Sequence, residues 1–264
     1  MPIFRYELRQ LRSYTIWWSV CMVFLIYAML PLYVDMISSG TLDLSAMGNS
    51  SLFAALNMDM SIISTPIGMF GWLTSFFAIA AGINGMFLGL KAFTKETVHK
   101  SAEFLYTKPY KRGAVYCAKV SAGLVSAVIT GAFYFAGSAA SAYMRLTDRV
   151  DFRLFSLIAL SFLLIEIFFV LFGALLGAVY SKIRTPLLAS AGIAFIFYVL
   201  SAFAGKVQAN GIKYITPFSY FGTSGIVHAG TYNAGYIAAF LILCVIFYAV
   251  GFLTFVKKDV SFIS

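Results

Sequence analysis

The chain has 264 residues, of which 61% are hydrophobic and 11% are charged, and its mean hydropathy is +0.89. A soluble domain could not bury that much apolar surface, so the composition excludes an ordinary water-soluble protein. The basic residues that give the net charge of +9 gather near the ends of apolar stretches. This distribution indicates membrane orientation and contact with anionic headgroups, and it argues against a nucleic-acid partner.

Residues 1–14 predict an amphipathic helix that lies along the membrane surface. Its apolar and basic arcs are formed by Phe4, Leu8 and Leu11, and by Arg5, Arg9 and Arg12. Glu7 falls near the apolar arc, where we expect it to pair with an arginine or to face a protein partner. Trp17 and Trp18 follow at the position of an interfacial aromatic belt.

Six apolar stretches are long enough to cross a bilayer, which takes about 20 residues. We place them at about 15–37, 66–90, 115–143, 154–180, 186–205 and 234–256. They should be helices, because an open strand in lipid leaves backbone groups unpaired. The fold class is therefore an all-α polytopic membrane protein with one transmembrane domain over residues 1–264.

The basic residues predict the orientation of these spans. With a cytoplasmic N-terminus, 14 of the 19 fall on the inner side: Arg5, Arg9, Arg12, Lys91, Lys95, Lys100, Lys108, Lys111, Arg112, Lys119, Lys182, Arg184, Lys257 and Lys258. The positive-inside rule therefore places both termini in the cytoplasm.

Small residues recur at a spacing of four along three of the spans. The sets are Gly85 with Gly89, Gly173 with Gly177, and Gly123 with Ala127 and Gly131. Such faces let helices approach closely in lipid, so we expect them to form contacts within one subunit or between two.

Residues 94–112 form a charged segment between the second and third spans. Val98, Ala102 and Leu105 share one face of a helix, and Glu96, Lys100 and Glu103 share the opposite face. Pro109 disfavours helix at Lys108 and so ends the element. We predict a short cytoplasmic helix at the membrane surface or, on the plainer interpretation, a solvated connector.

This segment resembles the loop between spans of ABC-2 type permeases. The matching residues are Glu96, Glu103, Phe104, Leu105, Lys108, Pro109 and Arg112. The Gly-Thr that usually precedes the second Glu is replaced here by Lys100-Ser101-Ala102. The six spans and the run from Pro217 to Phe221 also look like that family, so the resemblance extends over the whole chain.

The resemblance implies a transmembrane subunit of an ATP-binding-cassette exporter, whose loop is a coupling helix that docks on a separate ATPase. The docking residues would be Glu96, Val98, Ala102, Glu103, Phe104, Leu105 and Lys108. No G-x-x-x-x-G-K-[ST] motif occurs, so this chain should bind no cofactor itself, and ATP and magnesium should sit on the partner ATPase. A second permease subunit, identical or not, would complete a transporter in a bacterial cell membrane.

Glu166 lies near the middle of the fourth span, where a carboxyl group costs about 2.5–3.5 kcal/mol by insertion scales. It should therefore face a protein interior or water. A hydrogen bond to Ser, Tyr or backbone, contact with a cationic group of the cargo, and proton binding in a proton-coupled secondary carrier all stay open. The last of these is the alternative function.

The apolar, aromatic stretch at residues 206–233 is too short to span and predicts a re-entrant or interfacial hairpin. It contains Gly222-Thr223-Ser224-Gly225, a match to intramembrane serine proteases, but the last span carries no histidine to activate the serine. We therefore expect no catalytic residues and no metal site. The expected cargo is an amphipathic peptide, drug or lipid-like molecule.

Overall fold

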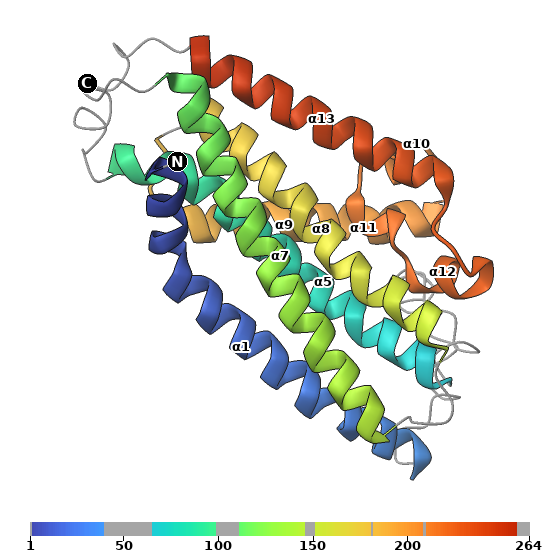
Figure 1. Ribbon diagram of the computed structural model, residues 1–264. Helices are drawn as coiled ribbons and strands as arrows, with labels where there is room; N and C mark the ends of the chain where they lie inside the picture. The colour runs from blue at the N-terminus through green and yellow to red at the C-terminus, as the bar shows by residue number, and fades with distance from the viewer. Residues whose placement is uncertain are drawn as a thin grey trace.

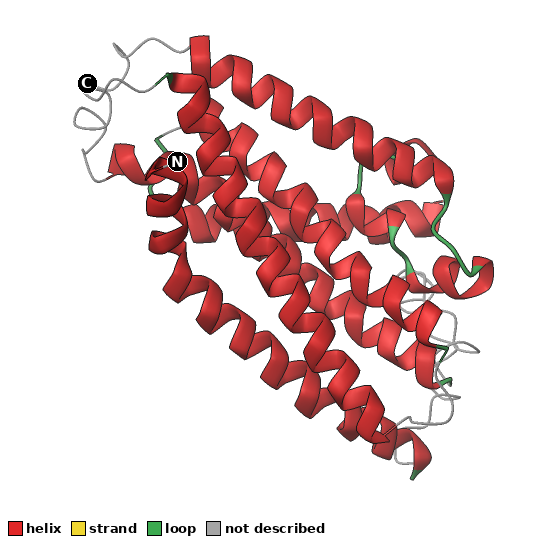
Figure 2. Ribbon diagram, viewed as in Figure 1, coloured by secondary structure: helices red, strands yellow, loops and turns green. Residues whose placement is uncertain are grey.

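The computed structural model describes residues 2–39, 65–98, 111–145, 151–180, 182–207 and 210–257, and every element among them is a helix (Figure 1, Figure 2). Six long helices are α1 (Pro2–Ser38), α5 (Pro66–Val98), α7 (Arg112–Arg145), α8 (Phe152–Val179), α9 (Pro186–Val207) and α13 (Ala234–Lys257). Each is long and apolar enough to cross a membrane. The predicted all-helical fold with six spans is confirmed.

Local sequence signals set several helix starts. α5 begins at Pro66, whose ring suits the first helical position and whose missing N–H needs no partner there. The Asp151 side chain caps α8 by accepting a hydrogen bond from the backbone N–H of Arg153 at 2.9 Å. Asn233 does the same for α13, accepting from the N–H of Gly235 at 2.9 Å.

The two central helices, α5 and α8, pack against each other along glycine faces. A Cβ atom at Gly85 would overlap the carbonyl oxygen of Glu166, and one at Gly89 would overlap the carbonyl oxygen of Val170. On α8, a Cβ at Gly173 would lie 2.6 Å from a carbonyl oxygen of α5. The predicted small-residue contact faces are thus confirmed within one subunit.

The remaining long helices surround this pair (Figure 1). α1 packs along α7, α13 packs on α8, and α9 packs on α5. Aromatic rings fill the spaces between them, as where Tyr134 of α7 stacks on Phe162 of α8 with ring centroids 4.2 Å apart. The start of α1, the end of α5, the start of α7 and the end of α13 gather at one end of the bundle, which we call the charged end.

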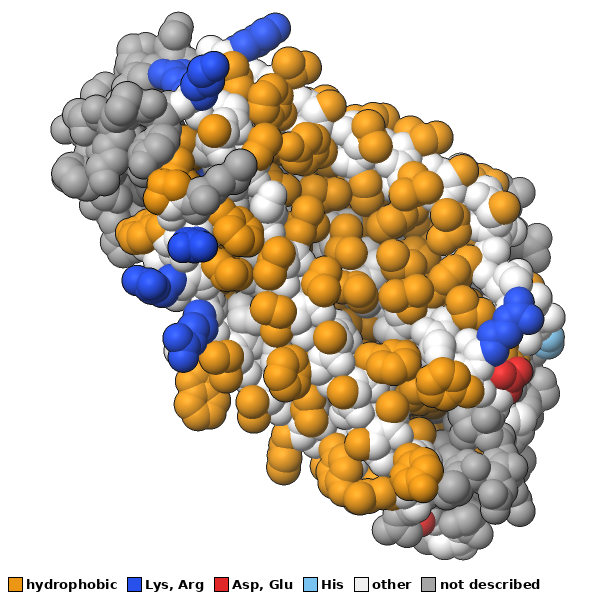
Figure 3. All heavy atoms as spheres, in the orientation of Figure 1, with side chains coloured by type: hydrophobic (Ala, Val, Ile, Leu, Met, Phe, Trp, Pro, Cys, Tyr) orange, Lys and Arg blue, Asp and Glu red, His pale blue; other side chains and the backbone are white. Residues whose placement is uncertain are grey.

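Lysine and arginine side chains mark the charged end, whereas hydrophobic side chains cover the middle of the visible face (Figure 3). This distribution is the one expected of a protein that spans a membrane. Which end faces the cytoplasm stays a prediction.

The N-terminal segment is part of α1 and is not a separate helix. Arg5, Arg9 and Arg12 are exposed, as an interfacial position requires. The apolar arc differs from the prediction of lipid contact, because Leu11 is buried and clusters with Leu88 of α5 and other residues of α7 and α8. Burying this arc inside the protein also buries Glu7, which lies beside it.

Within its described residues, the segment at 206–233 forms the end of α9 and three short helices: α10 (Asn210–Lys213), α11 (Pro217–Tyr220) and α12 (Thr223–Ala229). α11 packs on α9, α13 and α8, and α12 packs on α5 and α8. α12 ends at Gly230, whose left-handed backbone (φ 65°) favours glycine. The depth of this segment in a membrane stays a prediction.

Candidate functional site

A buried charge cluster ties three helices together at the charged end. It consists of Glu7 from α1, Lys95 from α5 and Lys119 from α7. Lys95 Nζ donates to Glu7 Oε2, and Lys119 Nζ lies 3.4 Å from Glu7 Oε1. The side chains of Lys119 and Glu7 are only 0% and 4% exposed, so this carboxylate compensates cationic charge out of water.

Further hydrogen bonds fix both lysines of this cluster. Lys119 Nζ donates to the carbonyl oxygen of Ala92 at 2.5 Å and lies 5.6 Å from the centre of the Phe93 ring. Lys95 Nζ donates to Gln10 Oε1 at 2.6 Å. Every bond joins different helices, so a movement of the end of α5 would be transmitted to α1 and α7.

The predicted docking segment joins two of the helices that this cluster holds together. α5 continues through Val98, so Glu96 and Val98 extend a membrane helix and do not start a separate one. The other predicted docking residues lie outside the described residues: Ala102, Glu103, Phe104, Leu105 and Lys108. The chain is described again at Lys111, and α7 begins at Arg112. The Glu7 cluster thus holds the two helices that the segment joins.

The predicted interfacial tryptophans have different surroundings. Trp17 is 73% exposed, which suits a side chain at the membrane boundary. Trp18 is partly buried and packs on the Tyr14 ring, with centroids 6.0 Å apart. Only Trp17 therefore occupies an outward position.

Glu166 lies in a buried hydrogen-bonded chain that joins α8, α5 and α1. It is 0% exposed, and its Oε1 accepts a hydrogen bond from Asn84 Nδ2 at 2.5 Å. The Tyr14 hydroxyl in turn donates to Asn84 Oδ1 at 2.9 Å. Glu166 Oε2 is buried and has no hydrogen-bond partner among the described residues. The partner is thus an asparagine, whereas the sequence had suggested Ser, Tyr or backbone.

Substitution should separate the packing of Glu166 from its charge. In Glu166→Gln the side-chain oxygen can still accept from Asn84, so the free energy of unfolding should change little. Glu166→Leu leaves the buried Asn84 donor unpaired and should lower that free energy by about 1–3 kcal/mol. Unfolding in detergent micelles measures both. Equal losses in the two variants would show that ionisation, and not the hydrogen bond, stabilises this site.

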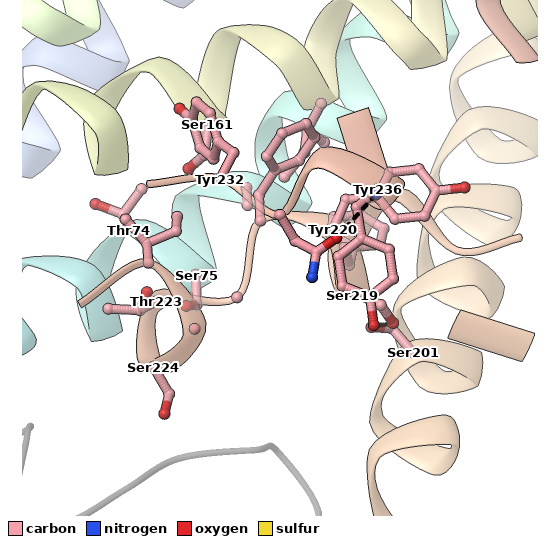
Figure 4. Close-up of a pocket in the computed structure, with 18 of the residues that line it drawn as sticks. Thr74, Ser75, Ser161, Ser201, Ser219, Tyr220, Thr223, Ser224, Tyr232 and Tyr236 are labelled. Carbon is pink, nitrogen blue, oxygen red and sulfur yellow. Dashed lines mark hydrogen bonds between the residues drawn. The ribbon is translucent and has the colours of Figure 1, made fainter. Parts of the chain in front are cut away.

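A cavity of about 660 Å³ lies toward the opposite end of the bundle, between α5, α8, α9 and the segment from Lys213 to Tyr236. Figure 4 shows hydroxyl-bearing side chains around it. They are Thr74, Ser75, Ser161, Ser201, Ser219, Tyr220, Thr223, Ser224, Tyr232 and Tyr236. Glu166 is not among the lining residues, although its neighbour Ile165 is.

Internal hydrogen bonds fix the wall of this cavity. The Tyr220 hydroxyl donates to the carbonyl oxygen of Tyr214, and the Tyr232 hydroxyl to that of Leu157, each at 2.5 Å. Burial raises the pKa of Tyr220 to about 12, so this hydroxyl stays protonated at physiological pH. The wall therefore presents neutral hydroxyl groups in fixed positions.

Several residues of the charge cluster, the Glu166 chain and the cavity carry no sequence pattern that predicts their role. Lys119 lies inside a predicted span, where a lysine indicates a buried partner or a function, whereas the positive-inside rule uses it only as an inner-side charge. Asn84 had no distinguishing pattern, and the cavity hydroxyls are spread from Thr74 to Tyr236. Their proximity depends on how the helices pack.

A family model described as ABC-2 family transporter protein matches residues 1–260. No curated protein matches the chain.

Proposed function

Since the matched family model covers nearly its whole length, this chain belongs to the ABC-2 family of transporter proteins, and we propose that it works with a separate ATPase as an exporter permease. Membership makes it a membrane subunit of an ABC transporter. The proposed cargo is an amphipathic peptide, drug or lipid-like molecule. The proposed location is a bacterial cell membrane, with both termini in the cytoplasm and ATP and magnesium bound by the ATPase.

The Glu7 cluster is the observation that carries this proposal. It holds together α5 and α7, the two helices on either side of residues 99–110. An ATPase that displaced this segment would move helix ends that are joined by buried ion pairs and hydrogen bonds. The cluster thus gives the segment a mechanical connection to α1 as well.

The outer helices leave room for a second permease subunit. α13 is buried only at Phe240, Cys244 and Gly251 along its length. It exposes large apolar side chains such as Leu241, Val245 and Leu253. Lipid or a second permease subunit would cover such a surface, and we propose that two permease subunits, identical or not, form the transporter.

The runner-up function is a proton-coupled secondary carrier. One observation favours it: the buried Glu166 carboxyl group has an oxygen, Oε2, without a hydrogen-bond partner among the described residues. Transport in ATP-free vesicles that follows a pH gradient and is lost in Glu166→Gln would support the carrier.

Leu105→Asp tests the docking role of the 94–112 segment. A charge on the predicted apolar face should detach the ATPase, because truncated central anchors in an interface commonly cost 1 kcal/mol or more. We expect transport and co-purification with the ATPase to be lost while the membrane domain stays folded. Lys100→Asp, on the predicted opposite face, is the matched control. Normal assembly and transport in Leu105→Asp would refute the docking assignment.

A further inference from the structure

We propose that the 660 Å³ cavity binds an amphipathic molecule whose head is hydroxylated or anionic and carries no positive charge. This inference rests on the proposed export function, because it makes the cavity a cargo site toward the end of the bundle opposite the docking segment. It narrows the cargo class by excluding cationic molecules.

Size and apolar surface suit the lipid-like part of such a ligand. Ligand pockets commonly measure about 300–1,000 Å³ and combine apolar walls with a few polar groups. Trp72, Phe218 and Phe221 supply aromatic surface on the wall of this cavity. Phe218 packs on Phe169 of α8 with ring centroids 5.5 Å apart, so this part of the wall is supported from behind.

Several hydroxyl groups of the polar wall face a ligand as hydrogen-bond acceptors, because they donate within the protein. Ser161 donates to the carbonyl oxygen of Ile158 at 2.6 Å, and Thr223 to that of Gly71 at 3.0 Å. Tyr232 likewise donates within the protein. A hydroxyl that has used its hydrogen keeps its lone pairs, so these groups can accept from a ligand. Ligand hydroxyl groups supply the matching donors.

Charge disfavours cationic heads in this cavity. Of the described residues that line the cavity, only Lys213 is charged. A cation would lose hydration without gaining a carboxylate, and Lys213 would repel it. An anionic group would instead be attracted to Lys213, so uncharged and anionic heads both fit.

Tryptophan fluorescence can test binding directly, because Trp72 lines the cavity and the chain has only three tryptophans. The double variant Trp17→Phe with Trp18→Phe keeps Trp72 as the only reporter. Purified in amphipol, it is titrated with amphiphiles that share one brominated alkyl chain and differ in the head: maltoside, sulfate or trimethylammonium. Bromine quenches a tryptophan that it contacts.

We expect saturable quenching by the maltoside and the sulfate, reversed by their unbrominated forms, and binding of the trimethylammonium amphiphile weaker by about tenfold or more. Lys213→Gln should weaken binding of the sulfate but not of the maltoside. Ser224→Phe adds a bulky ring to the cavity wall and should weaken saturable quenching without loss of helical signal. A Trp17-only variant, whose reporter is 73% exposed, measures non-specific partition.

Equal, unsaturable quenching of Trp72 and Trp17 by all three amphiphiles would overturn the site. Tighter binding of the trimethylammonium amphiphile would overturn the ligand class. This assay contains no ATPase and no transport step. A separate transport assay that finds no ATP-driven export would therefore refute the proposed function and leave the binding result unchanged.

Discussion

Glu7→Leu should lower the free energy of unfolding by about 3–5 kcal/mol, because it removes the carboxylate that compensates the fully buried Lys119 ammonium group. The loss of the Lys95 partner should contribute less to this destabilisation than the loss of the Lys119 partner, because Lys95 is 15% exposed and also bonds to Gln10. In the proposed exporter the variant should also weaken the stimulation of the ATPase by the permease, since α1 is no longer tied to α5 and α7. Denaturant titration in micelles and ATP hydrolysis by the complex measure the two effects.

A double variant distinguishes the ion pair from general packing. Adding Lys119→Met to Glu7→Leu removes the two most buried charges of the cluster and leaves only the 15% exposed Lys95. Apolar replacement of a buried pair is commonly neutral, so most of the stability should return. Arg9→Leu changes an exposed charge of the same helix and should alter stability by no more than about 0.5 kcal/mol. If the double variant is no more stable than Glu7→Leu, the cluster does not act as a charge pair.

Gly89→Ala should be the most disruptive small substitution in the chain's core. Its new Cβ would overlap the carbonyl oxygen of Val170 and lie 2.6 Å from the backbone nitrogen of Ala174. Backbone atoms cannot turn aside as a side chain can, so α5 and α8 must separate. We expect a loss at or above the usual overpacking range of about 1–3 kcal/mol, measured by the same unfolding titration.

Gly192→Ala is the matched control, because it is the same chemical change on α9 with no atom within 4 Å of the new Cβ. Alanine favours helix over glycine by about 1 kcal/mol, so this variant should be neutral or slightly more stable. Equal stability of the two variants would show that the glycine face of α5 does not set the distance to α8.

Hydropathy predicts the spans well, because an apolar stretch in lipid must pair its own backbone groups and a single helix does so. The fourth predicted span, 154–180, differs from α8 (Phe152–Val179) by two residues or fewer. The second, 66–90, ends too early, since α5 continues to Val98 through Lys91 and Lys95. Those lysines are tolerated because Lys95 pairs with Glu7 and Lys91 lies 5.5 Å from the Tyr14 ring centre.

Contacts between distant residues could not be predicted from sequence. Glu166 marked itself by its charge at mid-span, but nothing distinguished Asn84 as its partner 82 residues earlier. For Glu7 the sequence predicted pairing with an arginine or contact with a protein partner, whereas its two partners are lysines on other helices. Periodicity assigns a face to each residue but does not say which helix that face meets.

The cavity is hidden from sequence for a second reason. Most of its hydroxyl residues are common in membrane helices and carry no motif, as with Ser75 and Ser161, and the Gly222–Gly225 motif that holds Thr223 and Ser224 did not point to a cavity. Only the packing of α11 and α12 against α5, α8 and α9 encloses them. Residues of the 206–233 segment form part of the cavity wall, but the hairpin predicted there from sequence implied no cavity.

The central claim, that an ATPase docks on the 94–112 segment at the cytoplasmic face, is tested most directly by cysteine labelling and cross-linking. In a background with Cys21, Cys117 and Cys244 replaced by serine, Ser101→Cys and Ser50→Cys each carry one thiol. We expect an impermeant reagent added outside cells to label Ser50→Cys only, and Ser101→Cys to cross-link to a P-loop ATPase that co-purifies with the tagged chain. Labelling of both variants from outside, or no cross-link from Ser101→Cys, would contradict the account.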